Sequence, residues 1–214
     1  MLNTAVLTRV LATVAIALGS AAPCLPLSIA PESSLPLGPA VSTCLPGERG
    51  YLRASLRGAI DTELNWRGAE LQCEGGARPG GHGLRVSFLG PPDTKGHRLR
   101  LVFGLGVRPG LSTRSPAATN ITVIVEGQSQ VYTTRGDDRC TVESLVQEPV
   151  IEAGLSGLSP APSTYFLYRV AARGFCIDPA ATLDQRGRLY INRFDFAGLA
   201  RFEDNDLHAA APQP

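Results

Sequence analysis

The sequence has little of several residue types on which common functional sites depend. Its 214 residues include one lysine, one tryptophan, one methionine and three histidines. The five cysteines form no C-x-x-C pair, because even Cys24 and Cys44, the closest two, are 20 positions apart. Structural zinc sites use closely spaced cysteine pairs. We therefore expect no zinc site formed by cysteines, and we name no metal ligand and no cofactor. Calcium bound by Asp137, Asp138, Asp204 and Asp206 is a weaker alternative, because the sequence has no EF-hand or repeat pattern.

Clusters of like charge are also missing from the sequence. Lysine and arginine together number 20 and the acids 19, which gives a formal net charge of +1. The basic residues are almost all arginine, a bias typical of a GC-rich bacterial genome, and they are scattered along the chain. Proteins that bind nucleic acid or an anionic membrane usually carry a basic run or stripe. We therefore expect no nucleic-acid partner.

No local catalytic motif stands out, and we name no catalytic residue. The only histidines that could act as a base at neutral pH are His82, His97 and His208, and no motif surrounds them. Ser156 misses the G-x-S-x-G nucleophile elbow by one position. A glycosidase needs two carboxylates that come from distant strands and leave no local motif. An enzyme of this kind remains an alternative, with four candidate acids: Glu70, Glu74, Asp137 and Asp195.

The N-terminus has the order of a signal peptide. Arg9 lies in a short polar region, residues 10–19 are apolar, and small residues follow at positions 20–22. The apolar run is about half of the roughly 20 residues that a membrane-spanning helix needs. We predict a signal peptide over residues 1–21, no membrane span after its cleavage, and a periplasmic or secreted protein. Lipidation of Cys24 is a weaker alternative, because Pro23 occupies the position of the expected small residue.

Three segments are expected after the signal peptide. Residues 22–47 hold six prolines with little periodic pattern, which is typical of an extended tether. Their alternative is a strand laid over the domain by Leu25, Leu27 and Leu35. Residues 48–205 are predicted to form a single β-sandwich domain, and residues 206–214 a flexible tail.

Apolar and polar residues alternate with a period of two through most of the domain. The pattern is clearest in residues 97–107, where Leu99, Leu101 and Phe103 share one face. Such alternation indicates strands with one buried face. Further strands are predicted at residues 51–60, 62–74, 84–88, 121–125, 130–134, 164–176 and 188–197.

Two irregularities interrupt this pattern. A change of phase between Gly68 and Leu71 predicts a β-bulge, and residues 142–147 are predicted to form a short helix. Turns rich in glycine and proline separate the strands and favour antiparallel neighbours. The predicted fold is all-β, an antiparallel two-sheet β-sandwich that carries disulfides, with a jelly roll or a small barrel as alternatives.

Cysteines in an exported chain are first considered as disulfide partners. Cys140 follows a predicted turn and Cys176 ends a predicted strand, so we expect a bridge between them. Cys73 is the candidate partner of Cys44, which leaves Cys24 free or joined to a second molecule. Sequence does not determine this connectivity.

Aromatic residues give the only positive indication of function. Trp66 is the sole tryptophan, and tyrosines crowd the last two predicted strands. If some of them face outward, they form a stacking platform for sugar rings or for an apolar patch of a partner; the alternative is that they belong to the core. The candidate ligand-binding residues are Trp66, Tyr165, Tyr168 and Tyr190.

These observations favour a non-catalytic, exported binding or interaction protein of the bacterial cell envelope. Its expected partner is a glycan or an envelope protein. The alternatives are a carbohydrate-active hydrolase that uses paired carboxylates and a structural or assembly protein. An assembly protein requires an exposed strand edge or a self-complementary apolar patch.

Overall fold

The structure, a computed structural model, describes residues 44–45, 49–79, 83–150 and 165–208. All of them belong to the unit formed by residues 38–214. The predicted signal peptide and nearly all of the predicted tether lie outside the described residues, as does Ser156. The elements are β1 (Tyr51–Gly58), β2 (Thr62–Arg67), η2 (Gly68–Glu70), β3 (Gln72–Ala77), β4 (Leu84–Pro92), β5 (Arg98–Leu105), β6 (Ala117–Glu126), β7 (Gln130–Thr133), β8 (Cys140–Pro149), β9 (Tyr165–Cys176), β10 (Ala180–Ala181), β11 (Arg188–Glu203) and α1 (Asp204–His208).

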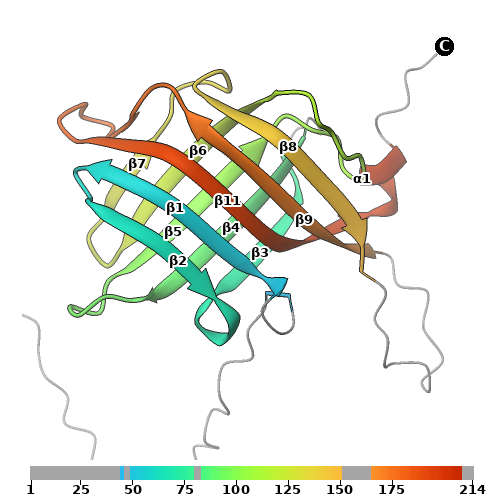
Figure 1. Cartoon of the computed structure of the whole chain (residues 1–214), viewed down its shortest axis with the longest axis horizontal. Helices are drawn as coiled ribbons and strands as arrows, with labels where there is room; N and C mark the ends of the chain where they lie inside the picture. Colours follow the sequence, from blue (N-terminus) through green and yellow to red (C-terminus); the bar gives the residue numbers. More distant parts are fainter. Residues whose placement is uncertain (1–43, 46–48, 80–82, 151–164, 209–214) are drawn as a thin grey trace, which may run out of the picture. The chain divides into compact units, whose positions relative to one another are not determined.

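The strands form one antiparallel sheet of 11 strands, shown in Figure 1. The hydrogen-bonded path runs β2-β1-β11-β10-β7-β6-β5-β4-β3, and β8 and β9 join β6 to β11 by a second route. These two routes close a partial ring. The all-β, antiparallel and disulfide-bearing class is therefore confirmed. The two-sheet sandwich is not confirmed, because these pairings connect all the strands into one sheet.

The core lies where the sheet folds over, so that β11 packs against β4 and β5. Phe194 and Phe196 of β11 point inward, since alternate residues of this strand are buried. The ring of Phe196 lies 5.0 Å from that of Phe88 and 4.6 Å from that of Phe103, and Phe194 lies 5.1 Å from Phe103. These aromatic contacts fix the spacing between the two parts of the sheet.

The predicted helix at residues 142–147 is wrong, because this segment belongs to β8. The pairing of β8 with β9 shifts between Val142 and Ser144, which leaves Glu143 as an extra residue. As a result the buried residues Val142 and Leu145 are three positions apart. A β-bulge therefore imitates helical spacing here.

The predicted bulge between Gly68 and Leu71 is also wrong. Residues Gly68–Glu70 form a short 3-10 helix that ends β2 and leads into β3. Gly68 has a φ of 58°, in the left-handed region. Glycine adopts this conformation readily because it has no Cβ atom to clash with the backbone. After β11, Asp204–His208 form α1, whose last three residues belong to the predicted tail of residues 206–214.

Both disulfides proposed from the sequence are present. Cys140 and Cys176 face each other in the register of β8 and β9, and their sulfur atoms are bonded. Cys44 is bonded to Cys73 of β3 and lies buried. Two intramolecular disulfides are consistent with an extracellular or otherwise oxidising environment.

None of the helices in the described part of the chain has the length and apolar character to cross a membrane.

Candidate functional site

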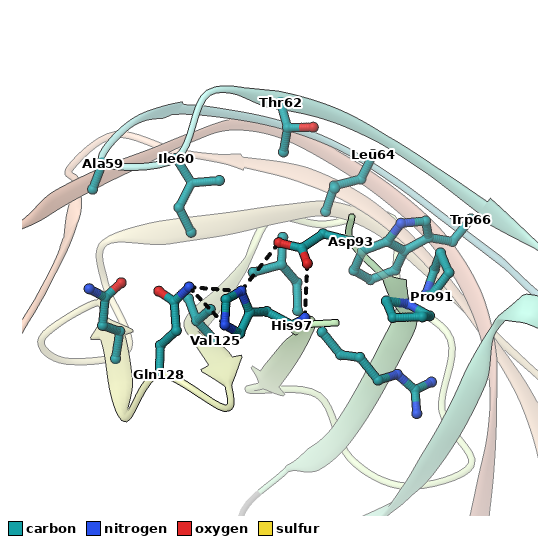
Figure 2. Close-up of a pocket in the computed structure, with 14 residues that line it drawn as sticks. Ala59, Ile60, Thr62, Leu64, Trp66, Pro91, Asp93, His97, Val125 and Gln128 are labelled. Carbon is teal, nitrogen blue, oxygen red and sulfur yellow. Dashed lines mark hydrogen bonds and ion pairs between the residues drawn. The ribbon is translucent and has the colours of Figure 1, made fainter. Parts of the chain in front are cut away.

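A cleft of about 420 Å³ lies between β2 and the hairpins β4–β5 and β6–β7 (Figure 2). We call it the Trp66 cleft. Its apolar walls are formed by Ala59, Ile60, Leu64, Trp66, Pro91, Pro92, Leu99 and Val125. Its polar residues are Thr62, Asp93, His97, Arg98, Gln128 and Gln130. Apolar walls with a few polar groups are typical of small-molecule sites.

The alternation of β2 supplies one wall of the cleft. Leu64 and Trp66 are buried, while the residues between and beside them are exposed. β2 stands at one end of the strand order. Across the cleft, β4 ends in Pro91 and Pro92, which have no backbone N–H to donate to a neighbouring strand. The gap between the two elements therefore remains a cleft.

Gly90 sets the position of the tryptophan ring. A Cβ atom at this residue would lie 2.3 Å from Cε2 and Cζ2 of Trp66, which is far inside van der Waals contact. The ring therefore rests directly on the backbone of β4. Because Trp66 is only 9% exposed, its indole is a fixed wall of the cleft.

The polar end of the cleft is a short network around His97. Gln128 Nε2 lies 2.9 Å from His97 Nδ1, and Asp93 Oδ2 lies 3.5 Å from the same atom. Figure 2 shows the three side chains converging from the β4–β5 and β6–β7 hairpins. Arg98 donates from Nε to the carbonyl oxygen of Gly90 at 2.7 Å, which holds its stem against the wall. The network links two hairpins at the edge of an apolar cavity.

The Asp93 carboxylate is held in its ionised form by this hairpin. Its Oδ1 accepts the backbone N–H groups of Lys95, at 2.8 Å, and His97, at 2.9 Å. Desolvation alone would raise the pKa of Asp93. The two backbone hydrogen bonds and the nearby His97 outweigh it, so the pKa lies below its ordinary value.

This lowered pKa predicts a structural change of the hairpin in acid. The ionised carboxylate stabilises the turn above its ordinary pKa, and that contribution is lost as the pH falls through the lowered one. We expect the amide signals of Lys95 and His97 in NMR spectra to titrate together with a midpoint below 3.8, the ordinary value for Asp. The Asp93→Asn variant should lack this titration. A midpoint above 3.8 would contradict the hydrogen-bonded arrangement.

The four aromatic residues predicted to bind a ligand do not come together. Trp66 lines the cleft, whereas Tyr190 is 44% exposed on β11. Tyr165 and Tyr168 are three positions apart on β9, which places them on opposite faces of the strand. Tyr168 packs on Phe202 with a ring separation of 5.4 Å, and Arg201 lies over the Tyr165 ring. The four residues therefore form no common platform.

The four candidate acids also lie on different elements. Glu70 is in η2, and Glu74 of β3 lies 3.6 Å from Arg100. Asp137 binds Arg78 at 3.2 Å and also accepts from Asn120. Asp195 of β11 accepts the hydroxyl of Tyr51 at 2.8 Å. Among the described residues, no group of three or more His, Cys, Asp or Glu side chains is arranged to hold a metal ion.

Sequence reasoning missed Asp93 and Gln128 as residues of the site. One signal was available: Asp93 follows two prolines and precedes Gly96, and an Asp at this place in a turn commonly accepts backbone N–H groups. Gln128 had no such signal, because it reaches His97 only through the pairing of β5 with β6.

Comparison with known proteins returned no matching family profile, curated protein or solved structure.

Proposed function

We propose that the protein is a non-catalytic binding protein, exported by a signal peptide at residues 1–21 to the periplasm or outside a bacterial cell. In this proposal the Trp66 cleft holds a small ligand, or one group of a larger envelope partner, that has an apolar body and a polar end. The two disulfides support an oxidising compartment.

The composition of the cleft carries this proposal. An indole ring, leucine and proline side chains line a cavity of about 420 Å³, which is within the size range of ligand sites. Its polar groups gather at one end, where His97 contacts both Asp93 and Gln128. An amphiphilic ligand would bury its apolar part against Trp66 and leave its polar part at this end.

Fluorescence of Trp66 tests the proposal directly, because the chain has no other tryptophan. We expect 1-anilinonaphthalene-8-sulfonate, which has an aromatic body and a sulfonate, to bind saturably at one site with energy transfer from Trp66. The Ile60→Phe variant narrows the cleft but keeps the indole. It should weaken binding about tenfold, since loss of about 1.4 kcal/mol of apolar burial corresponds to that factor.

Tyr190→Ala is the matched control, because Tyr190 is an exposed aromatic residue outside the cleft. It should leave the affinity unchanged. Neutral oligosaccharides form a second arm, and quenching of Trp66 by a sugar but not by the aromatic probe would point to a glycan in the cleft. If neither class of probe changes the emission of Trp66 in the oxidised protein, the cleft is not a binding site.

A further inference from the structure

A polar hollow lies on the outward side of β11, away from the Trp66 cleft. It has a volume of about 350 Å³ and is formed by β8, β9 and β11. Its main side chains are those of Glu143, Arg173, Phe175, Asn192, Arg193 and Asp195. We call it the bulge hollow, because two irregularities of the sheet meet there.

Two of its polar residues are the extra residues of β-bulges. Asn192 is skipped in the pairing of β11 with β1, where Ser55 faces Arg193 and Leu56 faces Ile191. Glu143 is skipped in the pairing of β8 with β9. A bulge disrupts the ladder and redirects a side chain, and bulges are common beside functional sites. Here two bulges on separate strands direct an amide and a carboxylate into one hollow.

The polar groups around the hollow have few partners within the protein. The side chains of Glu143, Arg173, Asn192 and Arg193 make no hydrogen bond or ion pair with the rest of the described chain. Asp195 uses Oδ1 to accept the Tyr51 hydroxyl, so Oδ2 remains available. Residues that carry two guanidinium groups, two carboxylates and an amide therefore line the same space.

The balance of charge selects the kind of ligand. A purely anionic ligand would meet Glu143 and Asp195, and a cationic one would meet Arg173 and Arg193. A hydroxyl group both donates and accepts, so neighbouring hydroxyls satisfy carboxylates and guanidinium groups together. Phe175 is 36% exposed at the hollow and offers a flat apolar surface to the C–H face of a sugar ring.

We propose that the bulge hollow binds a neutral sugar residue of a glycan chain. Glu143 and Asp195 accept from its hydroxyls, and Arg173, Asn192 and Arg193 donate to them. The site goes beyond the function proposed for the Trp66 cleft and shares none of its lining residues. The failure of either proposal therefore leaves the other intact.

NMR titration of the oxidised protein tests this site. The probes are neutral hexasaccharides of glucose, mannose and N-acetylglucosamine, with dialanine as a zwitterionic probe and hexagalacturonate as an acidic one. We expect at least one neutral hexasaccharide to shift the amide signals of Glu143, Asn192 and Arg193 in a saturable way. Asn192→Ala and Arg193→Ala should each weaken this binding about tenfold, the effect of one lost hydrogen bond to a charged or well-placed group.

Arg85→Ala is the control, since Arg85 is an exposed arginine of β4 outside the hollow. It should change the affinity by less than about twofold, an effect expected of a distant surface residue. Equal weakening by Arg85→Ala and Arg193→Ala would overturn the proposal. It would also be overturned if no neutral hexasaccharide binds, or if dialanine or hexagalacturonate binds more tightly than all three.

Discussion

The Phe103→Ala variant is expected to lose about 3–5 kcal/mol of unfolding free energy, the usual cost of truncating a buried phenylalanine. Phe103 is fully buried, and its ring contacts those of Phe88, Phe194 and Phe196 at separations of 6.0, 5.1 and 4.6 Å. Removing it opens a cavity between β5 and β11, where the sheet folds over. The surrounding rings can fill that cavity only in part, because interiors are close-packed.

The matched control is Phe166→Ala. Phe166 lies near the start of β9 and is 45% exposed, so its removal should change the free energy by no more than about 0.5 kcal/mol. Chemical denaturation of both oxidised variants measures the difference, and the melting temperature of Phe103→Ala should fall by roughly 6–20 °C. A loss below about 1.5 kcal/mol for Phe103→Ala would mean that β5 and β11 are not packed through this ring.

The sequence predicts a strand well where burial follows a strict alternation. In β6 the buried residues Thr119, Ile121, Val123 and Val125 are spaced by two, and the predicted strand lies within the observed one. The prediction fails at β8, because the extra residue Glu143 breaks the alternation and Val142 and Leu145 take helical spacing. The local pattern of apolar residues indicates which side chains are buried. A bulge shifts the buried residues by one position, so that their spacing no longer indicates a strand.

The candidate sites were less predictable, because they depend on which strands are neighbours. The sequence marks Trp66 as a candidate because it is aromatic. The cleft beside it forms only because β2 ends the strand order and faces the prolines of β4. In the bulge hollow, Arg173 and Asp195 face each other only in the register of β9 and β11. Such pairings join residues far apart in the chain, and one sequence alone does not specify them.

The two disulfides are expected to contribute nearly equal amounts to stability. The linked cysteines are 36 positions apart in Cys140–Cys176 and 29 apart in Cys44–Cys73. In the chain-entropy model the stabilisation depends on the logarithm of loop length, so each bridge is worth about 4 kcal/mol. The double variant Cys140→Ala, Cys176→Ala should lose about that much unfolding free energy in guanidinium chloride.

The variant that lacks Cys44 and Cys73 separates this entropic effect from local geometry. Cys140 and Cys176 join strands that already pair through nine positions of register. In contrast, the Cys44–Cys73 bridge joins a residue that precedes β1 to strand β3. If restriction of the unfolded chain dominates, the two double variants should agree within about 1 kcal/mol, because their loops differ little in length. A much larger loss in the variant lacking Cys44 and Cys73 would show that this bridge also holds native structure which hydrogen bonding alone does not maintain. Peptide mapping that links Cys73 to Cys140 would contradict both bridges.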